Sequence, residues 1–294
     1  MNSAKAIGVS GVLWLVLTVL PRAAYPGPPG DDIDALNPEQ AQLAQTMLGF
    51  VRDTEADFFA TVSRLNGAAP VQSRSFEFDD ADYTVKVTRG EVVEKAGFTV
   101  SMTKKAIKPY TQDALWSRTV TIDIHPKTPL VGFLHAFIAF QYNPDGKSSM
   151  GGSMDIVPGT RNEEDLTFIK EAVERVFEKH GADITNYRKV VSSGQRIKNL
   201  KAARIGVSFY ARPFLDITQE NFDLVTETFE TFIDAYIEVL EKRKNQPHTS
   251  EDLAAQDVMR VRWLEDQMIY DPYAIKVIPF AVRSWANFPP ETKY

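Results

Sequence analysis

The sequence predicts an α+β fold, a single domain in which a large, mostly antiparallel β-sheet is covered by α-helices on its faces. Between about Ser73 and Tyr142, short runs of residues alternate between apolar and polar with a period of two, which is typical of strands. On both sides of this region, apolar residues recur at helical spacing. Neither an internal repeat nor a long internal linker divides the chain. One sheet with helices packed on its faces follows from this order of elements.

The expected elements follow one another along the domain. A helix begins at Asn37, a good N-cap, with Pro38 at its first position, and it ends at Gly67. Five strands come next, and then a helix that Asn162 caps and Gly181 ends. The five strands are expected at 75–79, 83–88, 98–103, 120–125 and 131–142; a strand at 205–211, helices at 218–244 and 250–266, and a final strand at 274–282 follow.

The composition is that of an ordinary globular protein, and it excludes several classes of function. The chain has 294 residues, enough for a sizeable buried core. Because it has no cysteine, a disulfide framework, a thiolate zinc site and an iron–sulfur cluster are excluded. Acidic residues outnumber basic ones by 39 to 33, which opposes binding to a nucleic-acid backbone. We therefore expect no nucleic-acid partner.

The N-terminal segment has the layout of a signal peptide. Lys5 precedes an apolar run from Ala6 to Leu20, which is shorter than the roughly 20 residues that a membrane-spanning helix needs. We assign residues 1–24 to a signal peptide or short membrane leader, 25–36 to a linker and 37–294 to the folded domain. No stable membrane span is expected. The predicted location is the secretory pathway or the extracellular space, with a membrane-tethered or a mitochondrial protein as the alternatives.

The stretch from Thr121 to Pro158 holds the candidate functional residues. His125 lies at a strand end before two prolines, and His135 lies on the returning strand. Asp155 follows two glycines within an apolar sequence, where a buried carboxylate must be paired, hydrogen-bonded or raised in pKa. Each also has a structural interpretation, a hydrogen-bonded core residue for a histidine and a turn cap for the aspartate. The chain has no GxxxxGK[ST], GxGxxG, GxSxG or HExxH motif, so phosphate-loop, dinucleotide, hydrolase and metalloprotease functions lack support.

These motifs resemble, in the same order, those of the oxygen-dependent coproporphyrinogen III oxidases, from about residue 40 to the C-terminus. The segment IDIHPKTPLVGFLHAF is similar to the family's IHPxNPxxPxxHxN, with the two histidines ten residues apart as in the family. MGGSMDIVP resembles GGGxDLTP, and RVRWLEDQMIYD resembles RGRYVEFNLxxDRGT. The series continues in VVEKAGFTVS, EED, NYRKV, IGVSFYA and NFPPETKY. The resemblance implies the fold of this family and a homodimer.

The resemblance also implies a reaction. Family members oxidatively decarboxylate two propionates of a tetrapyrrole to vinyl groups, with dioxygen as co-substrate and no organic cofactor. Asp155 would accept hydrogen bonds from N–H groups of the substrate, and His135 would act as general acid or base. Phe137 and Ala139 stand where the family has an asparagine and an arginine that engage substrate. We therefore predict an oxidase whose substrate is a smaller, less carboxylated aromatic heterocycle than coproporphyrinogen III.

Several alternatives remain open at this point. The chain is alternatively a genuine coproporphyrinogen III oxidase of porphyrin biosynthesis, or a non-catalytic relative that binds a porphyrin or another aromatic ligand. His125, His135 and Asp155 are a candidate divalent-metal site that leaves positions for dioxygen. Arg262 and Glu265 either contact substrate or belong, with Arg260, to an exposed salt-bridged helix face. The expected substrate-binding residues are Phe137, Ala139, Gly151, Gly152, Arg262 and Glu265, and we expect Asp155 and His135 to line one enclosed pocket.

Overall fold

The computed structural model describes residues 33–193, 205–210 and 214–293. The assignment of residues 1–24 to a leader lies outside the described residues. Residues 32–294 form one compact unit. None of the helices in the described part of the chain combines the length and the apolar character that a membrane crossing requires.

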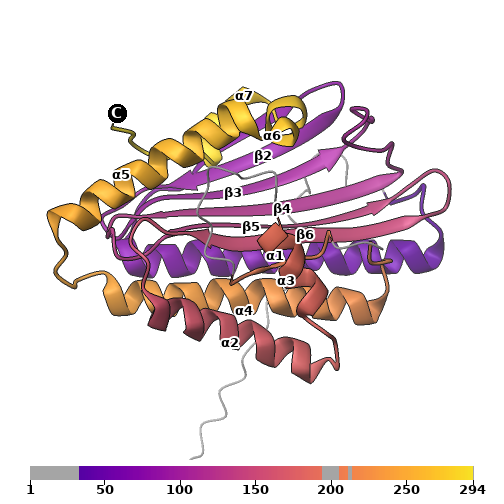
Figure 1. The fold of residues 1–294 in the computed structure, drawn as a ribbon. Helices are drawn as coiled ribbons and strands as arrows, with labels where there is room; N and C mark the ends of the chain where they lie inside the picture. The colour runs from indigo at the N-terminus through magenta and orange to yellow at the C-terminus, as the bar shows by residue number, and fades with distance from the viewer. Residues whose placement is uncertain (1–32, 194–204, 211–213, 294) are drawn as a thin grey trace, which may run out of the picture. The chain divides into compact units, whose positions relative to one another are not determined.

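The described residues form one seven-stranded sheet in which every strand pairs with its neighbours in sequence order (Figure 1). All the pairs are antiparallel. This is the mostly antiparallel sheet that the sequence predicts. The strands are β1 Gln72–Glu77, β2 Ala81–Thr88, β3 Val93–Thr103, β4 Trp116–Pro126, β5 Phe133–Tyr142, β6 Ser148–Val157 and β7 Val207–Ser208.

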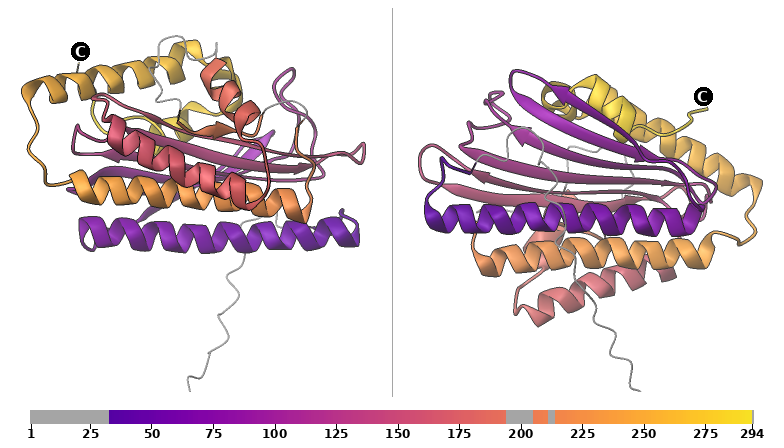
Figure 2. Two further views of the ribbon diagram at one scale, coloured as in Figure 1. Left: turned by 60° about the horizontal axis from the view of Figure 1, so that its bottom comes forward. Right: turned by 180° about the vertical axis from the view of Figure 1, so that it is seen from behind.

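Helices cover both faces of this sheet (Figures 1 and 2). On one face, α1 contacts β3 and α4 contacts β5 and β6, while α2 packs on α4. On the other face, α7 contacts β2 and β3, and α5 runs across the same side (Figure 1). The helices are α1 Pro38–Asn66, α2 Glu163–Lys179, α3 Thr185–Ser193, α4 Gln219–Arg243, α5 Ser250–Glu265, the π-helical turn η2 Asp266–Tyr270, α6 Pro272–Val277 and α7 Phe280–Ala286.

The long helices begin where their caps predict. Asn37 and Gln40 form a capping box at the start of α1, and Pro38 occupies its first position. Asn162 caps α2 and Thr218 caps α4 through their side-chain oxygens. These three helix starts confirm the sequence-based assignment.

The two faces of the sheet differ in chemistry. Ile122, Leu134 and Ile138 point toward α1 and α4, and all three are fully buried in the main apolar core. Their neighbours in the strands point toward α5 and α7, and many of these are polar or aromatic. The side of α5 and α7 is the face that holds the candidate functional side chains of β4 to β6, and it is called the upper face below.

The C-terminal part of the domain departs from the sequence-based prediction. The final strand expected at 274–282 is wrong, because this segment forms α6 and α7. Asp271 caps α6 by accepting hydrogen bonds from the backbone N–H groups of Tyr273 and Ala274, and Pro272 occupies the first helical position. Pro279 then separates the two short helices. Local capping has therefore outweighed the β-branched composition of AIKVIPFAV.

Two further segments differ in extent. Residues Ser148–Val157, for which the sequence predicts no strand, form the full strand β6. Of the strand expected at 205–211, only Val207–Ser208 pairs with β6, and residue 211 lies outside the described residues.

Candidate functional site

Three polar residues lie in one row across the upper face of the sheet. Asp123 of β4 is the register partner of His135 of β5, and His135 is the register partner of Asp155 of β6. Directly opposite residues of antiparallel strands point to the same face, with Cβ atoms about 5 Å apart. The fold therefore places His135 between two carboxylates. Asp123 is buried, whereas His135 and Asp155 are partly exposed.

The bond between Asp123 and His135 determines which nitrogen of the imidazole is available. His135 Nδ1 lies 2.7 Å from Asp123 Oδ1. Because a carboxylate only accepts, Nδ1 carries the hydrogen, and Nε2 is the nitrogen that can exchange a proton with another molecule. Among the described residues, none makes a hydrogen bond to Nε2. The side chain of Asp123 is 1% exposed and that of His135 is 28% exposed, so the pair is anchored in the sheet and open on the imidazole side.

Asn287, just after α7, ties this pair to the C-terminal segment. Its side-chain Nδ2 donates to Asp123 Oδ1 at 3.0 Å. Its backbone carbonyl accepts from His125 Nε2 at 2.9 Å and from Trp263 Nε1 at 3.2 Å. One residue therefore fixes the carboxylate behind His135, a second histidine and the indole that covers the site.

The structure gives His125 a structural environment. Burial, with the charge of Lys95 as the next cause, holds the pKa of His125 well below its usual value, so the ring is neutral. The imidazole stacks on Phe133, with ring centroids 4.2 Å apart, and Phe133 in turn stacks toward His135 at 6.4 Å. Phe133 thus lies between the two histidines. His125 takes no part in the row of Asp123, His135 and Asp155.

This arrangement bears on the metal site expected from the sequence. Within the residues that the structure describes, no group of three or more histidine, aspartate or glutamate side chains is placed to hold a metal ion. His125 and His135 each already donate one ring N–H to the protein. The metal set of His125, His135 and Asp155 therefore stays a prediction of the sequence.

Aromatic side chains surround His135 on the upper face. Trp263 of α5 lies 5.2 Å from the imidazole and 4.6 Å from Phe133, measured between ring centroids. Phe137 lies 5.6 Å from His135 and 5.8 Å from Tyr210. Trp263 is buried, and its ring packs beside His135 and Phe133 rather than in the main core. Such an environment favours a flat aromatic ligand.

Small residues continue the floor of this site. Ala139 pairs with Gly151 across β5 and β6. A Cβ on Gly151 would lie 2.6 Å from the ring of Tyr210, so the glycine permits the tyrosine to pack on the strand. Gly152 points to the opposite face, where a Cβ would lie 2.4 Å from the carbonyl oxygen of Phe137. Gly151 therefore shapes the upper face, whereas Gly152 serves strand packing.

Asp155 is held by its own strand. Its Oδ1 accepts a hydrogen bond from the backbone N–H of Ile156 at 2.8 Å, and the side chain is half-buried. The hydrogen bond from Ile156 helps to orient the carboxylate of Asp155, the candidate catalytic aspartate of the sequence, which is the register partner of His135.

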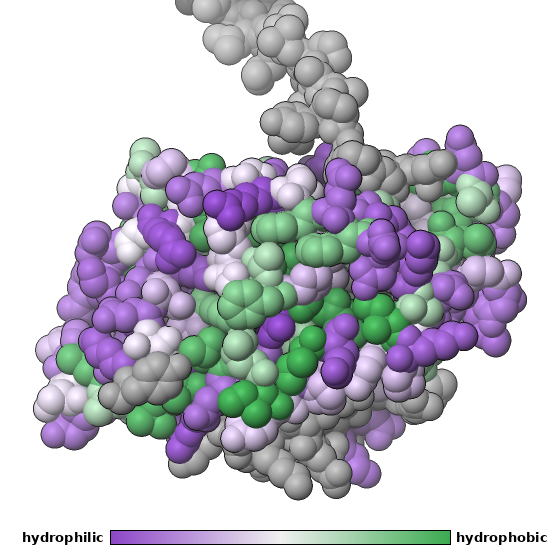
Figure 3. All heavy atoms as spheres, turned by 90° about the horizontal axis from the view of Figure 1, so that it is seen from above, coloured by the Kyte–Doolittle hydropathy of each residue, from purple (hydrophilic) through white to green (hydrophobic). Residues whose placement is uncertain are grey.

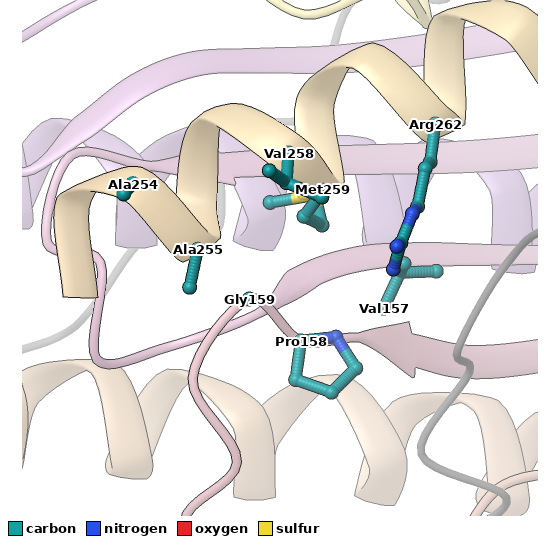
Figure 4. A pocket seen from close by; sticks show the side chains of 8 residues that line it. All are labelled: Val157, Pro158, Gly159, Ala254, Ala255, Val258, Met259 and Arg262. Carbon is teal, nitrogen blue, oxygen red and sulfur yellow. The ribbon is translucent and has the colours of Figure 1, made fainter. Parts of the chain in front are cut away.

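Arg262 of α5 lies over the end of β6. Its side chain reaches toward Val157 and lines an open, mostly apolar pocket formed by the end of β6 and α5 (Figure 4). No described residue makes a hydrogen bond or ion pair with its guanidinium. Arg260 is buried and pairs with Glu94 of β3, so the exposed salt-bridged face suggested for Arg260, Arg262 and Glu265 is not formed. Glu265 is half-buried beside this turn.

The surface on this side is markedly apolar. Seen from the side of α5 and α7, apolar side chains gather across the middle of the face between polar margins (Figure 3). Ile269, Tyr270 and Phe280, from η2 and α7, are all more than 45% exposed.

Sequence reasoning missed Asp123, Asn287 and Asp266. Asp123 had a detectable signal, because it alternates with Thr121 and His125 on one strand face. Asp266 lies three residues after the buried Trp263 and is itself buried, with its pKa raised to about 7, mainly by burial and then by Asp271. Asn287 had no signal in the sequence, since its role depends on where the chain end docks.

A family model described as Coproporphyrinogen III oxidase matches residues 46–277. The chain belongs to the coproporphyrinogen III oxidase family. The match covers every strand of the sheet, α1 from its third turn onward, and α5 with Trp263 and Arg262. It therefore includes the row of Asp123, His135 and Asp155.

Three curated relatives share 28% or less of the aligned residues with the chain. An oxygen-dependent coproporphyrinogen-III oxidase of Francisella philomiragia is 28% identical over 162 residues, which are 52% of this chain and 51% of that protein. The mitochondrial oxygen-dependent coproporphyrinogen-III oxidase of Rattus norvegicus is 24% identical over 256 residues, 79% of this chain and 54% of that protein. The mitochondrial enzyme of the same description from Mus musculus is 25% identical over 213 residues, which are 66% of this chain and 45% of that protein. The chain spans about half the length of these curated relatives.

Proposed function

We propose that the protein is an oxygen-dependent oxidase that acts on an aromatic heterocycle with a ring N–H, and that its substrate is a compound other than coproporphyrinogen III. The observation that carries this proposal is the hydrogen bond from His135 Nδ1 to Asp123, beside Asp155 on the next strand. It provides an oriented proton-exchanging nitrogen next to a carboxylate. Membership in a family with oxygen-dependent oxidases supports the reaction class.

The two exposed groups of the row have different tasks. The carboxylate of Asp155 accepts a hydrogen bond from the ring N–H and favours loss of that proton, which makes the ring a better electron donor. Nε2 of His135 takes up or returns a proton at the reacting carbon or carboxylate. Asp123 keeps the imidazole in one tautomer and stabilises its protonated form.

Dioxygen accepts the electrons. In an oxidative decarboxylation of a propionate side chain, the carbon next to the ring loses a hydride equivalent, the carboxylate leaves as carbon dioxide, and a vinyl double bond forms. The hydride equivalent and one proton reduce dioxygen to hydrogen peroxide. Peroxide formation is therefore a readout that does not depend on knowing the substrate.

The surroundings of the row support a less carboxylated substrate. Phe137 and Ala139 replace an amide and a cation of the family pattern, which removes partners for substrate carboxylates. The rings of Phe137, Tyr210 and Trp263 offer contact to a flat apolar ring instead. Arg262 of α5 lies over the end of β6 and supplies a cation for one carboxylate at the edge of such a ligand.

The test is an untargeted incubation of the purified protein with an extract of its source, under dioxygen and under nitrogen. We expect one aromatic compound to disappear, with formation of peroxide, only when protein and dioxygen are both present. Asp155→Asn should abolish this consumption. Asp145→Asn is the matched control, because Asp145 lies in the exposed β5–β6 loop and pairs with Lys147.

Coproporphyrinogen III is assayed in parallel, by vinyl-porphyrin fluorescence beside an authentic family enzyme. A comparable rate with both enzymes would make the protein a genuine coproporphyrinogen III oxidase of porphyrin biosynthesis. Ligand binding without oxygen-dependent consumption would identify a non-catalytic binding protein. Full activity of Asp155→Asn would show that the reaction takes place elsewhere in the chain.

A further inference from the structure

An open pocket lies between α5 and the turn that follows β6 (Figure 4). Its volume is about 320 Å³, at the lower end of the range for small-molecule sites. Seven of the eight residues that line it have no polar side chain, and the eighth is Arg262. The pocket therefore combines apolar walls with one cation.

The end of the pocket near the start of α5 is closed. A Cβ on Gly159 would lie 2.8 Å from the backbone of Ala255, so the turn touches the helix at this point. Thr160 Oγ1 donates to Asp252 Oδ1 at 2.7 Å and holds the turn against the first turn of α5. These contacts are made within the protein itself, so the pocket is formed before a ligand binds.

Arg262 lies at the other end of the pocket. Ala254 and Arg262 are eight residues apart, about 12 Å along the helix axis. The guanidinium reaches from α5 toward Val157 (Figure 4). Arg260 of the same helix pairs with Glu94, whereas no described residue makes a hydrogen bond or an ion pair with Arg262. The N–H donors of this half-buried side chain are thus available to a ligand.

The inner wall of the pocket is shared with the candidate site. Val157, Met259 and Trp263 belong to one buried apolar cluster. The ring of Trp263 lies 5.2 Å from that of His135. Val157 follows Asp155 by two residues on the same face of β6, which is about 7 Å along the strand. An aliphatic arm that extends from a ring at Asp155 along β6 would therefore enter this pocket.

We propose that the pocket binds an aliphatic chain that ends in a carboxylate. The apolar walls bury the chain, and the guanidinium of Arg262 binds the carboxylate through two parallel hydrogen bonds. One cation matches the single charge of a carboxylate, whereas a phosphate group carries up to two. The chain is either a free fatty acid or a carboxylate-bearing arm of the oxidase substrate. The pocket is independent of the proposed reaction, and only its assignment to a substrate arm rests on the proposed function.

The experiment titrates the full chain with sodium octanoate and follows the methyl group of Met259 by ¹³C NMR. Met259 lines the pocket and is 4% exposed, and its signal is assigned as the one that is absent from Met259→Leu. We expect a saturable shift in the wild type. Arg262→Gln should weaken octanoate binding at least tenfold, because a charged hydrogen bond is lost. The neutral 1-octanol should bind the wild type at least tenfold more weakly than octanoate, and the substitution should not change its affinity.

Arg175→Gln is the matched control, since Arg175 is an exposed arginine of α2 and the substitution changes the net charge equally. It should leave the octanoate affinity unchanged. Val258→Asp tests the wall with a residue that is 47% exposed, and its carboxylate should repel octanoate. The proposal is overturned by equal octanoate affinity of wild type and Arg262→Gln, by octanol binding as tightly as octanoate, or by the absence of a saturable Met259 shift.

Indole-3-butyrate, which has a ring N–H and a carboxylate arm, distinguishes the two sources of the chain. If the pocket receives a substrate arm, Asp155→Asn should weaken indole-3-butyrate binding at least threefold and leave octanoate binding unchanged. If the pocket receives a free fatty acid, Asp155→Asn should change neither affinity. All titrations measure binding without turnover, so failure of the proposed oxidase function would leave the octanoate result intact.

Discussion

At the scale of single residues, the contact between Asp123 and His135 determines what the site can do. The carboxylate fixes the hydrogen on Nδ1, and only then is Nε2 a defined acid or base. Asn287 and the buried position of Asp123 in β4 keep that carboxylate in place. Buried residues behind the partly exposed histidine therefore set its tautomer.

Asp123→Asn is the direct test of this role. The amide keeps the shape of the side chain but can also donate, so the imidazole is no longer confined to one tautomer. We expect a fall of roughly 10²- to 10⁴-fold in the oxygen-dependent rate, by analogy with other histidine–aspartate pairs. Ring ¹⁵N shifts of His135 should change from a single Nδ1–H form to a mixture. An unaltered ¹⁵N pattern would contradict the assigned tautomer.

Asp266 gives the stability of the protein a specific pH dependence. Its pKa is about 7 in the folded protein and near 3.8 in the unfolded chain, so between these values the folded state holds a proton that the unfolded state has lost. Stability should therefore fall as the pH rises from about 4 to 7, by at most roughly 4 kcal/mol, and then level off.

Asp266→Asn should remove this loss, because the amide is neutral throughout. Urea unfolding at pH 4 and pH 8 measures the effect as a difference between wild type and variant. We expect the variant to gain stability over the wild type only at pH 8. Asp257→Asn, in a half-exposed position of α5, should follow the wild type at both values. Equal free energies of unfolding for Asp266→Asn and wild type at pH 8 would show that Asp266 is not buried as a neutral acid.

At the scale of elements, the sequence predicts well wherever local signals decide. Caps at Asn37, Asn162 and Thr218 and the period-two runs of β2 to β5 are local, and they locate these helices and strands. The sequence does not predict strand β6, because Gly151 and Gly152 interrupt its alternation of apolar and polar residues and have a low preference for strands. Pairing with β5 along its whole length stabilises the strand despite these glycines.

The C-terminal segment shows the limit of such reasoning. The apolar residues of 274–282 alternate as in a strand, but Asp271, Pro272 and Pro279 favour short helices, and the docked α7 then buries Val282 and Ala286 on β2. A Cβ on Gly97 would lie 2.7 Å from the carbonyl oxygen of Ala286, so α7 approaches β3 closely only because residue 97 is glycine. Neither the docking nor the placement of Asn287 beside Asp123 has a local sequence signal.

Asn287→Ala tests how much this docking contributes. The change removes the hydrogen bond to the carboxylate of Asp123 and leaves the backbone carbonyl that binds His125 and Trp263. Loss of a bond to a charged group costs about 1.5–3 kcal/mol, and denaturant unfolding should show a loss of this size. Asn221→Ala, which removes an exposed side-chain bond to the carbonyl of Asp216, is the control and should cost less than about 1 kcal/mol. Equal losses in the two variants would mean that Asn287 holds nothing in place.

At the scale of the whole molecule, the two faces of the sheet differ in role: the lower face, opposite the upper face, forms the main core, and the upper face carries the candidate site. The lower face packs apolar side chains against α1 and α4, while the upper face carries Asp123, His135 and Asp155 under a partial cover of α5 and α7. Because strand side chains alternate, substitutions on the upper face can change specificity without disturbing the main core.

Alternation is visible in the sequence, which is why the positions of His135 and Phe137 could be predicted. The order in which the strands pair is a long-range property, so Asp123 and Asp155 could not be assigned to one row in advance.

This separation allows specificity to be exchanged on one strand. Phe137→Asn combined with Ala139→Arg restores the asparagine and arginine of the family pattern, on half-buried positions of the upper face. Each charged hydrogen bond gained with a substrate carboxylate is worth about 1.5–3 kcal/mol, which corresponds to roughly a tenfold to a hundredfold change in rate when it forms in the transition state. We therefore expect vinyl-porphyrin formation from coproporphyrinogen III to rise at least tenfold over the wild type, while consumption of the native aromatic compound falls.

Gln141→Arg is the control for this double variant. It places a cation on the same strand and face, two residues beyond Ala139 and further from His135, and should leave both rates near those of the wild type. If Gln141→Arg raised the porphyrin signal as much as the double variant does, general attraction of an anionic substrate would explain the gain, and Phe137 and Ala139 would not be specificity residues.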